Sequence, residues 1–185
     1  ITHGPDLHRR LRAATRANPS HEPNVRIKFT SVMVDDQAKA LKFYTEVLGS
    51  VRKADLPAGA GRWLTVVSPA EPNGTELILD PISFEPARTF QAALFKARIP
   101  LTAFQADDIQ KEFDRLTKLG VKFASKPRQF EGTIAADFED TCGNRIQLFQ
   151  PPGAGNATTS PAIRLSLTSV IVPDQELALK FYTEK

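Results

Sequence analysis

The chain has 185 residues, of which 41% are hydrophobic and 24% are charged, and this composition is typical of a folded protein with a hydrophobic core. No apolar run approaches the ~18 residues that a membrane-spanning helix needs, and no signal peptide is recognisable, so we expect neither a membrane protein nor a secreted one. Cys142 is the only cysteine, which excludes an internal disulfide and makes a reducing cytoplasm the expected location.

The net charge of +3 comes mainly from residues 1–24, a polar and basic N-terminal arm. Four arginines face two acidic residues there, whereas residues 25–150 carry 17 basic and 16 acidic side chains. A nucleic-acid-binding face needs basic side chains clustered over an extended surface. We therefore expect no nucleic-acid partner and interpret the arm as a frayed tail.

A first module is predicted over residues 25–80. Residues 29–34 alternate between apolar and polar, as a strand with two different faces does. A helix follows, with Asp36 as its N-cap and Gly49 as its left-handed stop. Three further strands are expected near residues 50–54, 62–68 and 75–80, separated by turn-forming stretches.

A second module, residues 99–151, repeats this plan after a linking helix at 86–98 that has Phe90 and Leu94 on one side. Its strand at 101–106 precedes a helix capped by Asp108 and stopped by Gly120. The remaining strands are expected at 122–124, 133–139 and 144–149, with "DTCGN" as the hairpin turn between the last two.

The hexapeptide "LKFYTE" occurs twice because residues 163–185 repeat residues 25–47, with 14 identical pairs in 23 at a constant offset of 138. We interpret the second copy as the truncated start of a further βαβββ module, joined through a flexible linker at 152–162. A lone strand and helix cannot bury their apolar faces. We therefore expect this segment to dock on a sheet edge, either in its own chain or in a neighbouring one, with a homodimer as the consequence.

Five stretches together resemble the vicinal oxygen chelate superfamily, which includes glyoxalase I, bleomycin resistance proteins and extradiol dioxygenases. They are "SVMVDDQAKALKFYTEVLG", "GRWLTVVSP", "TELILDP", "TAFQADDIQKEFDRLTKLGV" and "DFEDTCGNRIQLFQP". The resemblance covers about residues 25–151. It implies an α+β fold in which two βαβββ modules form a curved eight-stranded mixed sheet around a cavity, with the helices outside.

In metal-dependent members of that superfamily, four side chains facing the cavity hold a divalent ion. The resemblance carries these positions over to Phe29, Glu76, Leu101 and Gln147. Phenylalanine and leucine offer no lone pair, and a neutral amide is a poor ligand for Zn, Ni or Fe. All three histidines lie in the N-terminal arm. We therefore expect no metal and no other cofactor.

What remains is an apolar and aromatic cup, the usual composition of a small-molecule site. If the strand alternation holds, its members are Phe29, Ser31, Met33, Trp63, Glu76, Leu101, Gln105, Gln147 and Phe149. Trp63 is either a ligand-stacking wall or a packing residue, and Arg62 and Leu64 are the alternative to Trp63 and Thr65 on this face. Glu76 is either a buried general base or a carboxylate bonded to Gln147 or paired with Arg145. Cys142 is expected to serve hairpin geometry and not as a nucleophile.

Two functions follow from these residues. The first is a metal-free binding protein, similar to the bleomycin resistance proteins, which holds an aromatic or planar small molecule in the cup. The alternative is a lyase, isomerase or dioxygenase similar to glyoxalase I, with Glu76 as catalytic base or metal ligand. A regulatory or purely structural role is the third possibility. The missing metal ligands favour the binding protein.

Overall fold

The computed structural model describes residues 26–59, 61–130, 132–154, 163–168, 170 and 172–183. The predicted N-terminal arm and most of the predicted linker lie outside these residues. Within them, the strands and helices follow one another in the order of two βαβββ modules and a further βα pair. No helix of the described residues is long and apolar enough to cross a membrane.

The first module contains a four-stranded sheet whose strand order is β1-β4-β3-β2. Its parts are β1 (Phe29–Val34), helix α2 (Gln37–Lys42) with the π-helical turn η1 (Phe43–Val47), β2 (Val51–Ala58), β3 (Gly61–Val67) and β4 (Glu76–Pro81). Strands β1 and β4 are parallel, and the other two pairs are antiparallel. Asp36 caps α2 as predicted, since its carboxylate accepts from the N–H groups of Ala38 and Lys39 at 2.8 and 3.0 Å.

The second module repeats this topology in a separate sheet whose order is β6-β7-β8-β5-β9. Helix α3 (Glu85–Ala97) links the two modules. The module consists of β5 (Thr102–Gln105), α4 (Ile109–Lys118), β6 (Arg128–Phe130), β7 (Thr133–Glu139) and β8 (Arg145–Gln150). One predicted strand is misplaced: residues 122–124 contribute only an isolated bridge from Phe123 to Phe138, and β6 lies further along the chain.

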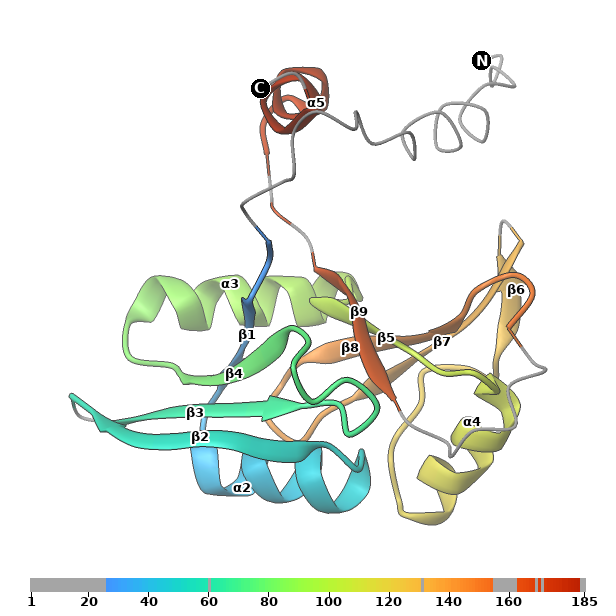
Figure 1. Ribbon diagram of the computed structural model, residues 1–185, viewed down its shortest axis with the longest axis horizontal. Coiled ribbons are helices and arrows are strands. Elements are labelled where there is room, and N and C mark those ends of the chain that lie inside the picture. Colours follow the sequence, from blue (N-terminus) through green and yellow to red (C-terminus); the bar gives the residue numbers. More distant parts are fainter. Residues whose placement is uncertain are drawn as a thin grey trace.

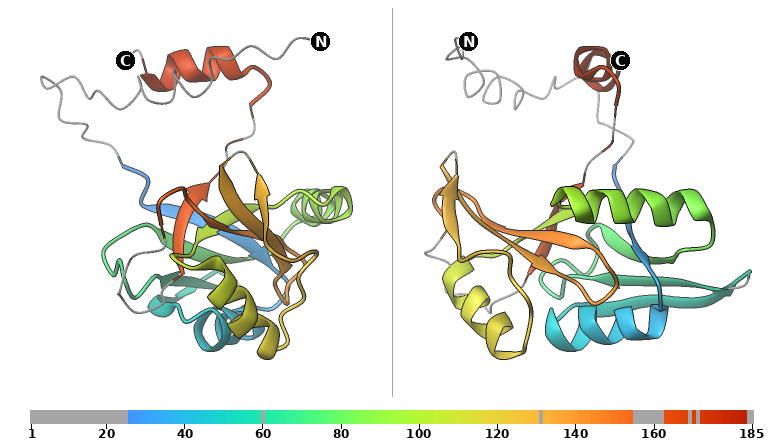
Figure 2. Two further views of the ribbon diagram at one scale, coloured as in Figure 1. Left: turned by 90° about the vertical axis from the view of Figure 1, so that its right-hand side faces the viewer. Right: turned by 180° about the vertical axis from the view of Figure 1, so that it is seen from behind.

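The α+β class and the two modules are confirmed, and the eight module strands are divided between two sheets (Figure 1). The edge of β5 that could join them is occupied by β9 (Arg164–Thr168), the strand of the second repeat copy, which pairs antiparallel with β5. The prediction that this copy docks on a sheet edge is therefore correct, and the edge belongs to its own chain. Helix α5 (Gln175–Thr183) follows and lies apart from the body (Figure 2).

The two modules share one hydrophobic core, formed by alternate residues of both sheets and by α2 and α4. Val32, Leu64 and Leu79 enter it from the first sheet and Phe104, Phe138 and Leu148 from the second. Tyr44 is fully buried between them, with its ring edge-on to Phe104 at 6.4 Å between centroids. Since side chains alternate along a strand, most of the predicted cup residues lie on the opposite sheet faces, whereas Leu101 packs against this core.

The repeat provides a test of how much Tyr44 stabilises the fold. Its hydroxyl donates to the buried carboxylate of Asp140 at 3.0 Å, whereas the equivalent residue of the second copy, Tyr182, is 67% exposed. Tyr44→Phe removes the donor and leaves Asp140 with one partner fewer, so we expect a loss of about 2 kcal/mol in the free energy of unfolding. Urea denaturation measures it. The matched control, Tyr182→Phe, should change the value by less than about 0.5 kcal/mol, and equal losses would show that the buried hydrogen bond contributes nothing.

Candidate functional site

A cavity of about 710 Å³ lies between α3, the first sheet and the residues that lead into β5. Its floor comes from β1 and from the end of β4, where Met33 and Asp80 are cross-strand neighbours. Its cover is one side of α3, where Ala87, Phe90 and Leu94 recur at helical spacing. The full set of lining residues is Thr30, Ser31, Met33, Asp80, Pro81, Ser83, Phe84, Pro86, Ala87, Phe90, Leu94, Ile99, Pro100, Leu101 and Thr168.

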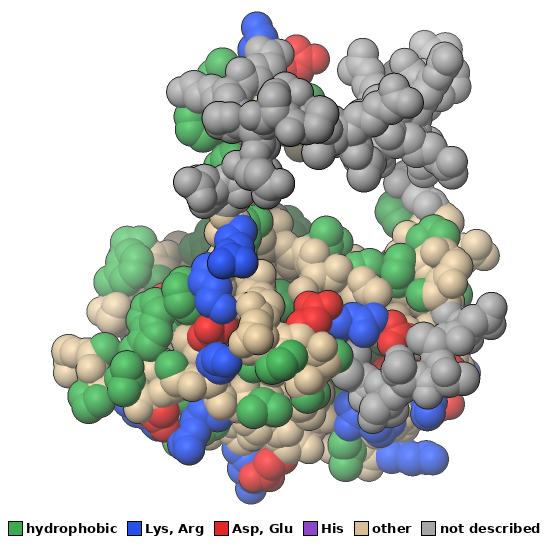
Figure 3. Space-filling view, in the orientation of Figure 1, with side chains coloured by type: hydrophobic (Ala, Val, Ile, Leu, Met, Phe, Trp, Pro, Cys, Tyr) green, Lys and Arg blue, Asp and Glu red, His purple; other side chains and the backbone are tan. Residues whose placement is uncertain are grey.

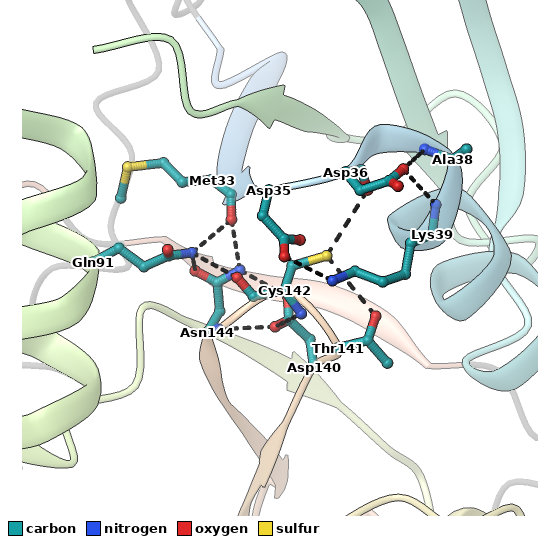
Figure 4. Close-up of polar contacts among 10 residues, drawn as sticks. All are labelled: Met33, Asp35, Asp36, Ala38, Lys39, Gln91, Asp140, Thr141, Cys142 and Asn144. Atoms are coloured by element: carbon teal, nitrogen blue, oxygen red, sulfur yellow. Dashed lines mark hydrogen bonds and ion pairs between the residues drawn. The ribbon is translucent and has the colours of Figure 1, made fainter. Parts of the chain in front are cut away.

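Helix α3 is held over β1 by a group of buried amides (Figure 4). The side-chain amide of Gln91 donates to the carbonyl of Met33 at 2.8 Å, to that of Cys142 at 3.0 Å and to Oδ1 of Asn144 at 2.9 Å. Asn144 also donates to the Met33 carbonyl, at 2.8 Å. Three acceptors share the two N–H groups of Gln91, so both of these donors are used in holding the cover.

The turn between β7 and β8 supplies the other half of this junction. Asp140 accepts from the N–H groups of Cys142 and Asn144, both at 2.8 Å, and from the Asn144 side chain at 2.7 Å. Burial raises the pKa of Asp140, although these hydrogen bonds act in the opposite direction. Gly143 adopts a φ of 88°, which a side chain would strain. The prediction that "DTCGN" forms the hairpin turn is confirmed.

The structure brings three of the nine predicted cup residues to this cavity, namely Ser31, Met33 and Leu101. Phe29 and Trp63 lie outside its lining and pack edge to face, with ring centroids 5.4 Å apart. Gln105 accepts from Ser166 of β9 at 3.2 Å, Gln147 donates to Asp137 at 3.4 Å, and Phe149 is buried. For the cup face of β3, the sequence left two alternatives, Trp63 with Thr65 or Arg62 with Leu64. Leu64 is fully buried in the core, so Trp63 and Thr65 are the pair on the cup face.

Glu76 has partners that the sequence did not indicate. Its carboxylate accepts from the hydroxyl of Thr65 at 2.8 Å and forms an ion pair with Lys28 at 3.2 Å. The predicted bond to Gln147 and the predicted pair with Arg145 are both wrong, since Arg145 pairs with Glu139 at 3.2 Å. Glu76 is buried and is absent from the cavity lining.

The four positions carried over from metal-dependent proteins are not equivalent in the two modules. Phe29 lies opposite Glu76 in the β1–β4 ladder, whereas Gln147 lies opposite Ala103, two residues beyond Leu101. Among the described residues, no three His, Cys, Asp or Glu side chains lie close enough together to hold a metal ion. The donors at the cavity itself are hydroxyl groups, backbone groups and one carboxylate, that of Asp80.

The role of α3 as the cover of the cavity was not predicted from the sequence. Its apolar side was recognised at Phe90 and Leu94, but nothing placed that side over β1. The available signal was Gln91, a helical amide on the side that also carries Ala87 and Leu94, because a buried amide must find partners.

Hydrophobic side chains gather where α3 begins and at the tip of the β2–β3 hairpin, and acidic and basic side chains are mixed elsewhere on this face (Figure 3). Phe84, Leu56 and Trp63 are among the exposed ones.

Comparison with known proteins identifies relatives of the chain. The sequence model of the Glyoxalase/Bleomycin resistance protein/Dioxygenase superfamily matches residues 26–148. "Uncharacterized protein YurT" from Bacillus subtilis (strain 168) is 45% identical over 126 residues, which are 68% of this chain and 99% of that protein.

Two solved structures have similar folds. UcmS2 is 29% identical with a TM-score of 0.60, over 68% of this chain and 97% of its own. TnmS3, described as an antibiotic binding protein from Streptomyces sp. CB03234, is 30% identical with a TM-score of 0.55, over 71% of this chain and 99% of its own.

Cys142 should be inert towards alkylating reagents. Burial raises the pKa of its thiol to about 11, and the reactive species is the thiolate. At pH 8 we expect iodoacetamide to modify the native protein more than about 100-fold more slowly than an ordinary exposed thiol. Mass spectrometry over time measures this, and the same protein in urea serves as the fully reactive control. Equal rates in the two states would contradict the buried position of Cys142.

Proposed function

Because the chain belongs to the Glyoxalase/Bleomycin resistance protein/Dioxygenase superfamily, we propose that it binds a small aromatic or planar molecule, without a metal ion, in the cavity beneath α3. The cavity itself carries the proposal. A volume of about 710 Å³ falls within the range of small-molecule sites. It is also continuous with the face on which the sequence analysis expected the ligand, through Ser31 and Met33.

The walls favour a flat and apolar ligand. Phe84 and Phe90 supply aromatic surface from α3 and the residue before it, and Leu94, Ile99 and Leu101 supply aliphatic surface. Met33 lies beneath them as a flexible side chain that adapts to different ring shapes. Ring systems gain both buried area and specific edge or stacking contacts against such walls.

The polar groups of the cavity restrict the charge of the ligand. Thr30, Ser31, Ser83 and Thr168 present hydroxyl groups that can donate to or accept from a phenol, quinone or amide. Asp80 is the only charged residue among the lining residues that the structure describes. A carboxylate with no cation beside it in the lining repels anions, so neutral or cationic ligands are favoured.

The similarity to TnmS3 supports a binding function. That protein is described as antibiotic binding, and its resemblance to this chain extends over 71% of the chain. We propose a small organic ligand for this chain as well, because its cavity has aromatic walls and hydroxyl groups that can anchor such a molecule.

The proposal is metal-free because of the side chains at the four carried-over positions. Phe29 and Leu101 have no donor atom, and Gln147 already bonds to Asp137. Glu76, the base or ligand of the enzymatic alternative, is occupied by Thr65 and Lys28 away from the cavity. A base must reach the proton that it removes, so this position favours binding over catalysis.

A first experiment tests the cavity with a neutral anthraquinone as the probe, by isothermal titration calorimetry. Phe90→Ala removes an aromatic wall and should raise Kd about tenfold. Trp63→Ala is the matched control, because Trp63 is an aromatic of similar exposure, 39% against 37%, that lies outside the lining. Its Kd should stay within about twofold of the parent value.

Two results would contradict this assignment. A greater loss of affinity for Trp63→Ala than for Phe90→Ala would move the site to the outer sheet face around Trp63 and Phe29. Failure to bind the anthraquinone, with no small molecule retained by the purified protein in native mass spectrometry, would contradict the binding function itself.

A second experiment tests for metal. We expect fewer than about 0.1 equivalents of Zn, Ni, Mn or Fe in the purified protein, because one carboxylate cannot replace a set of three or four ligands. Treatment with EDTA should leave the anthraquinone Kd unchanged. The methylglyoxal hemithioacetal should not be turned over, because its isomerisation relies on a Lewis acid to stabilise the enediolate. One equivalent of metal that is lost in Glu76→Ala would overturn the metal-free proposal.

A further inference from the structure

The strand that occupies the edge of β5 is a copy of β1. Thr168, Leu167, Leu165 and Arg164 of β9 lie opposite Thr102, Ala103, Phe104 and Gln105 of β5. At the offset of 138, the first four correspond to Thr30, Phe29, Ile27 and Arg26, in and just before β1. The β5 edge therefore holds a sequence that every molecule of this protein also carries a second time.

The contacts that hold β9 in place are ones that the β1 segment can also make. Arg164 forms an ion pair with Asp107, directly after β5, and a longer one with Glu71 at 3.9 Å. Arg26 is the same residue in the first copy. Leu165 packs against the shared core, and the equivalent Ile27 is also a branched aliphatic. Thr102 donates to the backbone carbonyl of Leu167 at 2.8 Å, a bond that needs no particular side chain.

Among the strands that the structure describes, β1 is the terminal strand of its sheet and pairs only with β4, so its other edge has no strand partner there. The two copies meet at one point, where the hydroxyl groups of Thr30 and Thr168 lie 2.8 Å apart. Hence β9 lies beside β1 and occupies the edge of β5. A β1 strand could pair antiparallel with β5 only at that same edge.

Pairing of β1 with β5 would complete the single sheet that the sequence analysis expects. The strand order would become β2-β3-β4-β1-β5-β8-β7-β6, with eight strands and no ninth. Within one chain, side chains of both sheets, α2 and α4 share one core, so moving β1 against β5 would disturb that packing. Between two chains, each core stays intact and both pairings form symmetrically.

We infer that the β5 edge is an exchange site for a β1-type strand, occupied either by β9 of the same chain or by β1 of a second copy. In the structure β9 has the advantage of being tethered, which gives it a high effective concentration at the edge. It therefore blocks the pairing of two copies. The homodimer that the sequence analysis expects then requires the departure of β9.

Charge reversal at Arg164 tests this inference. Arg164→Glu turns the ion pair with Asp107 into a repulsion and leaves β1 and β5 unchanged. We expect a roughly tenfold rise in the ratio of dimer to monomer, with the mass from light scattering moving from 20.4 kDa towards twice that value as concentration increases. Arg26→Glu alone should leave the parent distribution unchanged. The double variant should return to it, because neither strand then pairs with Asp107.

A mass that stays at one chain in Arg164→Glu, or a dimer that persists in the double variant, would overturn the inference. Disulfide trapping provides a second, covalent readout of the same exchange. Ala103→Cys with Phe29→Cys places thiols opposite each other only if β1 replaces β9, and Cys142 is too buried to compete.

Oxidation of that pair in the Arg164→Glu background should give a dimer band on a non-reducing gel. Ala103→Cys with Leu167→Cys is the matched control and should give an internally linked monomer, since these residues are cross-strand neighbours. Absence of the 29–103 dimer band, or an internal 29–103 link within one chain, would exclude exchange between copies.

Discussion

The backbone carbonyl of Met33 is the point on which the arrangement of the molecule depends. Two buried side-chain amides converge on it, that of Gln91 from α3 and that of Asn144 from the β7–β8 turn. Each amide is itself held by further hydrogen bonds, and Asp140 completes the junction. The junction therefore joins β1 of the first module, the linking helix and the second module. Since α3 is the cover of the cavity, the same contacts set its depth and width.

Local sequence predicted most of the elements because each carries its own signal. Alternation fixed the faces of β1, as the cross-strand pairs Phe29 with Glu76 and Met33 with Asp80 show. The caps Asp36 and Asp108 begin their helices, and Gly49 and Gly120 adopt the positive φ values, 78° and 84°, that were expected of helix stops. These features rest on contacts within a few residues, which the sequence displays directly.

The candidate site could be predicted only in part, because it depends on contacts between distant segments. Ser31, Met33 and Leu101 follow from strand alternation, but the cover of the cavity follows from three-dimensional packing of α3. The partners of Glu76 illustrate the same limit. Thr65 is 11 residues away and Lys28 is 48, and no periodic pattern links either to Glu76.

The repeated hexapeptide shows how strongly packing decides conformation. In the first copy, residues 43–47 form a π-helical turn, and Phe43 and Tyr44 are buried. In the second, Leu179 to Thr183 belong to the regular helix α5, where no residue is buried. A wider turn is unfavourable in isolation, so its presence in the first copy reflects the aromatic side chains that must enter the core. Identical sequence thus takes two helical forms according to what surrounds it.

The two proposals are thermodynamically coupled through Thr168. This residue belongs to β9 and also lines the cavity, so departure of β9 removes part of one wall. A ligand that contacts Thr168 binds the state with β9 in place more tightly and shifts the population towards it. By reciprocity, pairing of two copies through β1 weakens the affinity for such a ligand by the same factor. A ligand held only by α3 and β1 has no such preference. The dependence of ligand affinity on protein concentration therefore reports whether the ligand reaches β9.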